Sequence, residues 1–410
     1  MSQNRRGRSL RRAALPRAAL AALLLAAGLP GALGADGPGE EPPAKKATAR
    51  SWPSFRGNPQ MTGVATSTLP PKPELLWTFE TDDAVGSTAA IVGSVVYVGT
   101  DDGRVLAIDL AKGKKLWEHE VEGGIEASPC VAGATVYFGD GERTFHAVDA
   151  RTGKARWKHH AEAEIISSAS VTPGGSVLFG SYDSRLYCLK AADGKELWHF
   201  QTAAPVHCSP CLFSTTTDEG EKALATAIAG CDGHLRLVDV KDGKEISSVE
   251  IGGNISASPA FDGRRIYFGT LDGRMVAADA GAKKILWDVK AQGNSSFYAS
   301  AAVHSGAVVF AGRNRRAYCL KADTGKQLWV YEAKGGIDSS PVVVRDAKGD
   351  GARVIFGCKS GRIYALGLSD GKLKWSFEAG SEVTASPAIG EGRMVIGTAG
   401  GAVYCFGEKK

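Results

Sequence analysis

Short apolar stretches alternate with polar turns along most of this chain, and the alternation repeats with a long period. Residues 255–290, ISASPAFDGRRIYFGTLDGRMVAADAGAKKILWDVK, show the unit, in which apolar runs are separated by Asp-Gly turns at Asp262 and Asp272. The runs are too short for helices and have no helical period. Each unit is therefore predicted to form four short antiparallel strands.

A tryptophan recurs near the end of each unit, after a turn that contains glycine and lysine. The anchoring tryptophans are Trp77, Trp117, Trp157, Trp198, Trp287, Trp329 and Trp375. The gap of 89 residues between Trp198 and Trp287 spans two units, and its middle reads KDGKEIS, with Ser247 in the tryptophan position. Eight units of about forty residues result, and this period is typical of propeller blades.

The two ends of the repeat array complement each other. The chain enters the array with one isolated strand, ELLWTFE at 74–80, and leaves it after three strands that follow Val383. The first strand can complete the last blade, which leaves no open end. We predict an all-β fold: an eight-bladed β-propeller of four-stranded antiparallel blades over residues 74–407, closed by an N-terminal strand that completes the last blade.

The repeated tryptophans and turn glycines are interpreted as structural. A residue that recurs in every blade suits a symmetric frame better than one asymmetric site, so the tryptophans are predicted to pack between neighbouring blades. A ring of tryptophans stacked on a cofactor is the alternative. The innermost strand also carries a hydroxyl in every unit, which predicts packing and local hydrogen bonds. These hydroxyls belong to Thr88, Ser128, Ser168, Ser209, Ser258, Ser300, Ser340 and Ser386. No Gly-x-Ser-x-Gly elbow is present, and no catalytic residue is predicted.

One position breaks the repeat. Two residues before each hydroxyl the chain carries Gly86, Glu126, Ile166, His207, Ser256, Tyr298, Asp338 and Thr384. A frame selects the same residue in every blade, whereas a bound ligand does not. We therefore predict that Glu126, His207, Tyr298 and Asp338 line the mouth of an axial funnel and bind a ligand or partner. The alternative is that they are solvated residues at the start of a strand.

The eight cysteines suggest one covalent link. Cys208 and Cys231 correspond to residues that face each other across a hairpin in the aligned unit, so a Cys208–Cys231 disulfide is predicted. The CSPC stretch at 208–211 is no metal motif, since alternate strand residues point to opposite faces and no second cysteine pair has zinc-site spacing. No metal site is predicted.

The N-terminal residues differ from the rest. Residues 1–34 combine six arginines with an apolar run from Ala18 to Leu29 and a small-residue cleavage site, which is typical of a signal peptide. Without them the formal net charge is −1, so nucleic-acid binding is not expected. Residues 35–50 are predicted to be a disordered linker and residues 51–73 a lead-in segment. We expect an exported, soluble monomer in the periplasm or cell envelope, with no lipid anchor and no transmembrane segment after cleavage; an uncleaved anchor is the alternative.

The pattern in AIDLAKGKKLW at 107–117 and AVDARTGKARW at 147–157, with the lead-in WPSFRGNPQMTGV at 52–64, resembles the tryptophan-docking motif of the pyrroloquinoline-quinone-like (PQQ-like) repeat propellers. The resemblance covers residues 51–407 and implies the propeller fold. That family includes quinoprotein dehydrogenases and non-enzymatic members such as the scaffold lipoprotein of the outer-membrane protein assembly (Bam) machinery. The chain resembles the scaffold more than the dehydrogenases, since it lacks the adjacent Cys-Cys pair and the Glu/Asn/Asp set expected around calcium and the quinone.

We accordingly expect a non-enzymatic, exported scaffold that binds an envelope protein or peptide and needs no cofactor. One alternative is a PQQ-dependent sugar or alcohol dehydrogenase, which would bind PQQ and calcium. Another is a propeller that binds carbohydrate.

Overall fold

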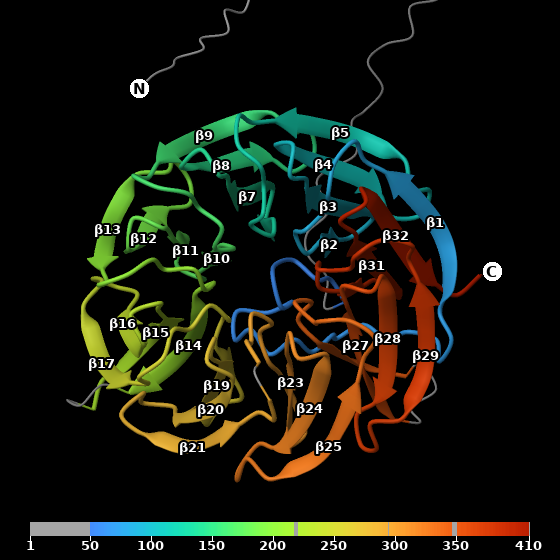
Figure 1. Ribbon diagram of the computed structural model, residues 1–410. Coiled ribbons are helices and arrows are strands. Elements are labelled where there is room, and N and C mark those ends of the chain that lie inside the picture. Colours follow the sequence, from blue (N-terminus) through green and yellow to red (C-terminus); the bar gives the residue numbers. More distant parts are fainter. Residues whose placement is uncertain (1–49, 217–219, 294, 347–350, 410) are drawn as a thin grey trace, which may run out of the picture. The chain divides into compact units, whose positions relative to one another are not determined.

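The computed structural model describes residues 50–216, 220–293, 295–346 and 351–409. All of them belong to one compact unit, Pro43–Lys410. The predicted signal peptide (1–34) and nearly all of the predicted linker (35–50) lie outside the described residues. The described residues form eight four-stranded antiparallel sheets around a central axis (Figure 1). The predicted eight-bladed β-propeller is therefore confirmed.

Each blade consists of four antiparallel strands that are arranged from the axis outward. Blade 1 is the sheet β2–β5, blades 2 to 7 follow in order, and blade 8 is β30, β31, β32 and β1. The innermost strands are β2 (Ala90–Val92), β6 (Cys130–Ala132), β10 (Ser170–Val171), β14 (Cys211–Thr216), β18 (Ala260–Phe261), β22 (Ala302–His304), β26 (Val342–Arg345) and β30 (Ala388–Gly390). The second strands are β3 (Val95–Gly99), β7 (Thr135–Gly139), β11 (Ser176–Gly180), β15 (Lys222–Ala229), β19 (Arg265–Gly269), β23 (Ala307–Ala311), β27 (Ala352–Gly357) and β31 (Arg393–Gly397).

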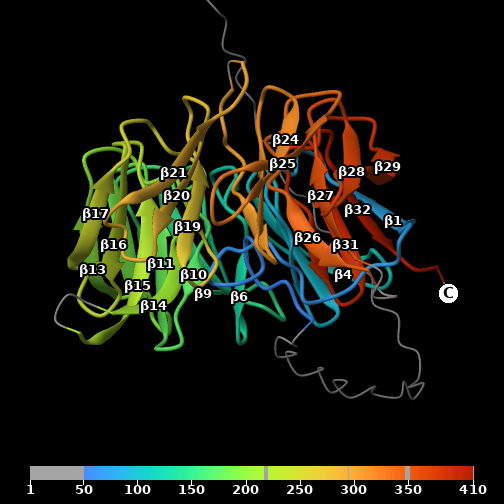
Figure 2. The same cartoon turned by 90° about the horizontal axis from the view of Figure 1, so that it is seen from below.

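The outer two strands together are longer than the inner two in every blade except blade 4. The third strands are β4 (Arg104–Asp109), β8 (Thr144–Asp149), β12 (Arg185–Lys190), β16 (His234–Asp239), β20 (Arg274–Asp279), β24 (Arg316–Lys321), β28 (Arg362–Gly367) and β32 (Ala402–Gly407). The outermost strands are β5 (Lys115–Glu120), β9 (Ala155–His160), β13 (Glu196–Gln201), β17 (Glu245–Glu250), β21 (Ile285–Lys290), β25 (Gln327–Glu332), β29 (Leu373–Glu378) and, for blade 8, β1 (Glu74–Glu80). Figure 2 shows the strands running between the two faces of the ring.

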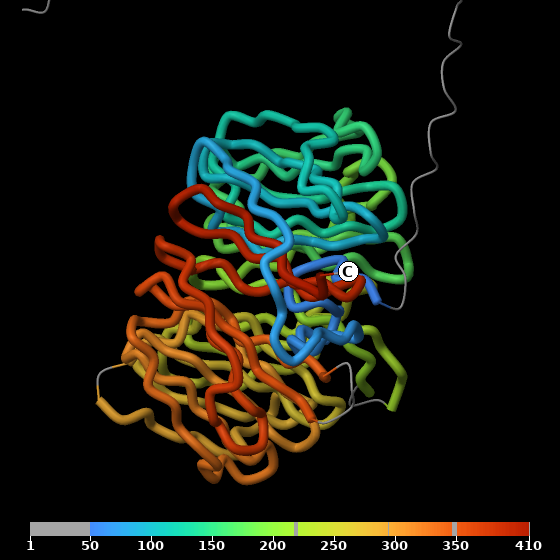
Figure 3. The backbone as a smooth tube through the Cα atoms, turned by 90° about the vertical axis from the view of Figure 1, so that its right-hand side faces the viewer, coloured from blue at the N-terminus to red at the C-terminus, as the bar shows by residue number. Residues whose placement is uncertain are grey.

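The ring is closed as predicted. Strand β1 pairs antiparallel with β32, so residues from the two ends of the array share one sheet. In Figure 3 the blue strand β1 lies beside the red C-terminal strand. The innermost strands β2 and β30 of blades 1 and 8 also contact each other. Closure leaves no blade with an unpaired side, which removes the open edge that an unclosed array would expose.

The outermost strand of every blade carries a β-bulge that the sequence reading did not predict. In blade 1, Trp117 pairs with Ala107, whereas the next pair joins Lys115 to Ile108, so Leu116 is the extra residue. A bulge places two residues opposite one and locally turns the strand. Here it leaves Leu116 half exposed and directs Trp117 toward blade 2.

The tryptophans bridge neighbouring blades. The indole N–H of Trp117 in blade 1 donates to the carbonyl of Ala150 in blade 2 at 3.1 Å. A Cβ added to Gly153, in the same turn of blade 2, would lie 2.6 Å from the Trp117 ring. Equivalent indole bonds join Trp77 to Leu110, Trp157 to Ala191, Trp198 to Val240, Trp287 to Ala322 and Trp329 to Leu368.

The blade without the tryptophan also lacks the matching glycine. Ser247 stands in the tryptophan position of blade 4, and its hydroxyl donates to the Gly281 carbonyl of blade 5. The turn of blade 5 carries Lys283 where the turns that face a tryptophan have glycine. The two changes go together because only a large ring needs a neighbour without a side chain.

The lead-in segment forms a strap across one end of the axis. It crosses the middle of the ring as the blue trace in Figure 1. In six of the eight innermost strands, one equivalent amide donates a hydrogen bond to a carbonyl of the strap, so that amide does not lack a partner at the free edge. The amide-to-carbonyl pairs are Ile91 to Trp52, Val131 to Pro53, Leu212 to Pro59, Phe261 to Gln60, Val303 to Thr62 and Val343 to Gly63.

Arg56 of the strap anchors it to the blades. Its side chain is buried and donates to the carbonyls of Ala301 (3.0 Å) and Pro341 (2.6 Å). Burial without a carboxylate partner lowers the pKa of Arg56 to about 9. A Cβ on Gly63 would collide with the guanidinium at 1.9 Å, so a glycine is required where the strap passes this side chain.

Candidate functional site

Hydrogen bonds surround the axis and span seven of the eight junctions between blades. The hydroxyl of each repeated serine accepts a hydrogen bond from a backbone amide of the preceding blade. These bonds therefore join neighbouring blades, whereas the sequence predicted hydrogen bonds within one blade. For example, the amide of Thr88 in blade 1 donates to the Ser128 hydroxyl of blade 2 at 3.0 Å. The further amide-to-hydroxyl pairs are Ser128 to Ser168, Ser168 to Ser209, Ser209 to Ser258, Ser258 to Ser300, Ser300 to Ser340 and Ser340 to Ser386.

The residue before each asymmetric position locks the local backbone. Ile125 is fully buried, and its amide donates to the Thr100 carbonyl of the preceding blade at 3.0 Å. Its side chain fills the space next to Gly99, where an added Cβ would lie 2.5 Å from Ile125. The same arrangement recurs at Ile165, Val206, Phe297 and Val383. A buried anchor of this kind holds the next residue in a fixed position beside the axis.

The asymmetric residues meet in one axial pocket. Its lining contains the whole asymmetric series and the hydroxyl ring, and its cavity volume is about 240 Å³. Phe55 of the strap lines the pocket as well. We call the asymmetric series the axial mouth; it comprises Gly86, Glu126, Ile166, His207, Ser256, Tyr298, Asp338 and Thr384. The structure thus brings Glu126, His207, Tyr298 and Asp338 together in one pocket, and binding by them remains a prediction.

One side of the axial mouth is cationic. Arg313 donates to both carboxylate oxygens of Asp338, at 2.8 and 3.0 Å, and Lys359 reaches the same carboxylate at 3.0 Å. The Arg313 guanidinium lies 3.7 Å from the centre of the Tyr298 ring, a cation–π geometry. Burial opposes ionisation of Asp338, but the bonds from Arg313 and Lys359 outweigh it and hold its pKa below the usual range. One carboxylate is therefore shared by two cations.

His207 is held by a neighbouring tyrosine. The Tyr182 hydroxyl lies 2.9 Å from His207 Nδ1, and the two rings are tilted with centroids 5.9 Å apart. Burial lowers the pKa of His207, which keeps the imidazole neutral at physiological pH. Burial and the nearby acidic groups Cys231, Glu126 and Glu164 raise the pKa of Tyr182. This part of the axial mouth is therefore uncharged.

The opposite side is acidic. Glu126 is exposed and stands beside Asp101 of blade 1. Burial, followed by repulsion from Glu126, Asp83 and Asp102, raises the pKa of Asp101. Among the described residues, no cation forms an ion pair with Asp101 or Glu126. Negative charge at this side is therefore poorly compensated.

The sequence reading missed a second asymmetric position. It lies in the loop between the second and third strands, and its amide is fixed by a hydrogen bond in every blade, as from Tyr182 to Glu164 at 3.0 Å. Its members, which we call the loop series, are Asp101, Gly141, Tyr182, Cys231, Leu271, Arg313, Lys359 and Ala399. Aligning the units on this loop would have revealed it, because it varies as strongly as the axial mouth. Tyr182 and Arg313 each contact the axial mouth residue of the next blade.

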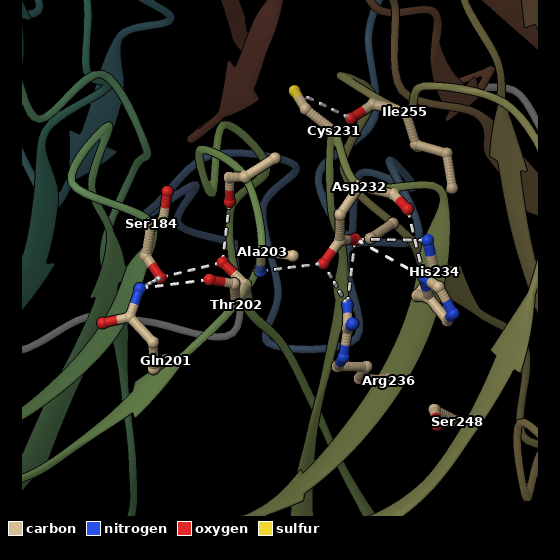
Figure 4. A network of polar contacts seen from close by, with 12 residues as sticks. Ser184, Gln201, Thr202, Ala203, Cys231, Asp232, His234, Arg236, Ser248 and Ile255 are labelled. Carbon is tan, nitrogen blue, oxygen red and sulfur yellow. Dashed lines mark hydrogen bonds and ion pairs between the residues drawn. The ribbon is translucent and has the colours of Figure 1, made fainter.

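The predicted Cys208–Cys231 disulfide is absent, and both cysteines are free in the structure. Cys208 is buried and accepts the Ala229 amide at 3.2 Å. Cys231 points instead to the Ile255 carbonyl of the next blade at 3.7 Å (Figure 4). The assumption that the two positions face each other was wrong, because Cys231 belongs to the turn beyond the paired strands.

Asp232 holds that turn in place. Its carboxylate accepts the Ala203 amide at 3.2 Å and is paired with Arg236 at 2.8 Å (Figure 4). The His234 amide donates to the same carboxylate at 3.2 Å. The network joins the loops on either side of β14 and β15 and holds the turn that carries Cys231.

The described residues lack both a metal-binding cluster and a membrane-spanning helix. They contain no group of three or more His, Cys, Asp or Glu side chains arranged to hold a metal ion. They also contain no helix, and hence none that could cross a membrane.

The residues of the axial pocket do not fit pyrroloquinoline quinone. That cofactor carries three carboxylates and needs cations around it. The pocket lining holds two carboxylates, Glu126 and Asp338, and the cations beside it, Arg313 and Lys359, are both paired with Asp338. Its volume also lies below the 300–1,000 Å³ that is usual for organic ligands of this size.

Comparison with known proteins places the fold in a family. The model of the β-propeller of beta-alanine-activating enzyme matches residues 142–410, and a model described as outer membrane protein assembly factor BamB matches residues 63–210. The crystal structure of BamB from Moraxella catarrhalis superposes with a TM-score of 0.69 at 16% identity, over 82% of this chain and 100% of that chain. Identity this low shows the fold alone.

The curated relatives match over shorter stretches. Beta-alanine-activating enzyme from Danio rerio is 33% identical over 103 residues, which is 25% of this chain and 9% of that protein. BamB from Burkholderia pseudomallei (strain K96243) is 28% identical over 107 residues, 26% of this chain and 27% of the relative. The matches thus span a small part of both relatives. The resemblance to PQQ-like propellers, with BamB nearer than the dehydrogenases, is confirmed, and the chain belongs to the β-propeller family of beta-alanine-activating enzyme.

Proposed function

We propose that this propeller is a non-enzymatic scaffold that binds a protein or peptide at the axial mouth, and that it works as an exported protein of the periplasm or cell envelope. The observation that carries the proposal is the contrast between the structural residues, which repeat in the blades, and the residues beside the axis, which do not. Hydroxyls, anchors and tryptophans repeat around the ring, whereas two series beside the axis differ in every blade. Similarity to BamB, whose name describes an assembly factor, supports a role in protein interaction.

The chemistry of the axial mouth supports binding over catalysis. Asp338 is neutralised by Arg313 and Lys359. The His207 imidazole is engaged by the Tyr182 hydroxyl, whose raised pKa disfavours the nucleophilic tyrosinate form. Among the described residues, no serine, threonine or cysteine of the pocket lining forms a hydrogen bond with His207, Glu126 or Asp338. We therefore propose that the protein works without PQQ, calcium or another cofactor.

A quantitative pull-down from the envelope fraction tests the proposal. The mouth variant Glu126→Ala/His207→Ala/Tyr298→Ala is compared with the wild type and with a far-face control, Lys112→Ala/Lys241→Ala/Asp323→Ala, whose residues are exposed in turns at the other end of the blades. Recovery of the partner should fall at least about tenfold for the mouth variant, a loss of about 1.4 kcal/mol. The control should match the wild type. Equal recovery with the mouth variant, or loss only with the control, would contradict the proposal.

A further inference from the structure

Charge is distributed unequally around the face that carries the axial mouth. This face is built from the loops that enter each innermost strand and the loops between second and third strands. In blades 1 to 3 these loops carry one base, Arg143, and many acids, which we call the acidic rim. The acidic rim consists of Asp82, Asp83, Asp101, Asp102, Glu122, Glu126, Asp140, Glu142, Glu162, Glu164 and Asp183.

The other side of the ring has the opposite sign. In blades 6 and 7 the same loops carry one acid, Asp338, and a set of bases that we call the basic rim. The basic rim consists of Arg313, Arg315, Lys334 and Lys359. Four blades separate opposite sides of an eight-membered ring, so blade 2 faces blade 6 and blade 3 faces blade 7 across the pocket. In Figure 1 the teal and green blades and the orange blades lie on opposite sides of the axis.

The loops of the other three blades are almost uncharged. They contribute only Asp232, Asp272 and Glu382, and Asp232 is already paired with Arg236. The charge difference therefore runs along one line across the axial mouth, with a neutral band on either side. One of these bands contains His207, whose partner Tyr182 comes from the adjoining loop of blade 3.

Part of the acidic rim is neutralised within the protein. Asp82 and Asp102 share Arg104, at 2.8 and 2.5 Å, and Glu162 pairs with Arg185 at 2.7 Å. The acids nearest the pocket keep their charge free, since no ion pair involves Asp101, Glu126 or Glu164 among the described residues.

The packing of like charges carries a physical cost. Repulsion from Glu126, Asp83 and Asp102 adds to burial in raising the pKa of Asp101. Folding alone does not require such repulsion, because a single lysine in place of Gly86, whose Cβ position lies 3.8 Å from an Asp101 oxygen, would relieve it. A cationic partner also relieves it, and low-dielectric walls around the pocket strengthen that attraction.

We propose that the axial mouth takes a polypeptide segment with separated charges, whose lysine- or arginine-rich stretch lies over the acidic rim and whose aspartate- or glutamate-rich stretch lies over the basic rim. The inference rests on the proposed scaffold function and specifies the chemistry and direction of the partner. Complementary charge fixes the register of a bound chain and repels the reversed orientation. The Arg313 side chain, held by Asp338 and stacked on Tyr298, offers an anion contact at a fixed place.

Two fluorescent peptides of identical composition test the proposal. The block peptide joins a run of lysines through a flexible Gly-Ser linker to a run of glutamates, and the alternating peptide mixes the same residues. Binding is measured by fluorescence anisotropy on the folded chain, at low and high salt. We expect the block peptide to bind at least about tenfold more tightly, and to lose that advantage in high salt, where the Debye length falls to about 3 Å at 1 M.

Variants and crosslinking fix the direction. Asp101→Asn/Glu126→Gln should weaken the block peptide about threefold to tenfold, whereas the far-face control Asp242→Asn/Asp323→Asn should have no effect. A photo-crosslinker on the lysine end should label loops of blades 1 to 3. If both peptides bind equally and Glu126→Ala/His207→Ala/Tyr298→Ala abolishes this binding, the proposed separation of charges in the partner is wrong. The proposed scaffold function would still stand. Binding of neither peptide, or binding that ignores all mouth variants, would overturn both.

Discussion

The contact between a tryptophan and the glycine of the next blade can be tested by a double-mutant cycle at Trp157 and Gly194. The Trp157 indole donates to the Ala191 carbonyl at 3.0 Å, and Gly194 of the same turn lies against its ring. A Cβ on Gly194 would stand 2.5 Å from the ring carbon Cε3, at a backbone φ of +73°. Gly194→Ala therefore combines two penalties, backbone strain and a collision with the indole.

The cost of backbone strain and the cost of the collision with the indole can be estimated separately, and Gly133→Ala is a control for strain alone. A left-handed backbone costs a residue with a Cβ about 1–2 kcal/mol, and an overpacked contact costs a further 1–3 kcal/mol or so. Gly194→Ala should thus destabilise the wild type by about 2–5 kcal/mol. Gly133 has a similar φ of +61° with no atom within 4 Å of its Cβ position. Gly133→Ala should cost only about 1–2 kcal/mol.

The background decides whether the tryptophan is the cause. Trp157→Ala should itself cost about 2–4 kcal/mol, since the ring is partly exposed and one hydrogen bond of about 1 kcal/mol is lost. In that background Gly194→Ala should cost no more than Gly133→Ala does. Equilibrium unfolding in urea measures all four corners of the cycle. If Gly194→Ala costs the same with and without Trp157, the proposed packing between blades is wrong.

Three further results are expected. Ser258→Ala should lower the free energy of unfolding by about 1–3 kcal/mol, because it leaves the buried Ser209 amide without its acceptor at 2.8 Å. A loss below about 0.5 kcal/mol in urea unfolding would refute a structural role for the hydroxyls. Gly63→Ala should displace Arg56 and expose the strap, which limited proteolysis with mass mapping at residues 50–69 would detect; unchanged protection would contradict the fit. Burial and Asp149 raise the pKa of Tyr97 to about 12, above an unfolded value of about 10. The contribution of the protonated Tyr97 hydroxyl to the free energy of unfolding is therefore complete below about pH 10 and is lost between about pH 10 and 12. Unfolding of the wild type and Tyr97→Phe should therefore converge over that alkaline range, and a constant difference would contradict the buried hydrogen bond to Ala150.

Repetition made the frame predictable from the sequence. Eight units of similar length, each with apolar stretches too short for helices, permit few architectures, and the isolated strand at 74–80 indicated how the ring closes. The axial mouth followed from the same alignment, because Glu126, His207, Tyr298 and Asp338 break a pattern that their neighbours keep.

The rest depends on contacts between blades, which a single repeat does not contain. The loop series went unnoticed because Arg313 and Tyr182 act on the next blade, at Asp338 and His207. The hydroxyl ring was expected to bond locally for the same reason. The disulfide prediction failed because it extended strand pairing to Cys231, which lies in a turn that Asp232 holds. The bulge before each tryptophan leaves no mark in the alternation of apolar residues.

The claim that the axial mouth binds a polypeptide can be tested by site-specific photo-crosslinking in cells. A photoreactive p-benzoylphenylalanine replaces Tyr182 or Tyr298 at the axial mouth, or Lys112 or Asp323 on the opposite face. We predict ultraviolet-dependent adducts of defined mass at residues 182 and 298 that become about threefold to tenfold weaker in the Asp101→Asn/Glu126→Gln background, and none at 112 or 323. Adducts only from the opposite face, or none from the axial mouth, would contradict the account.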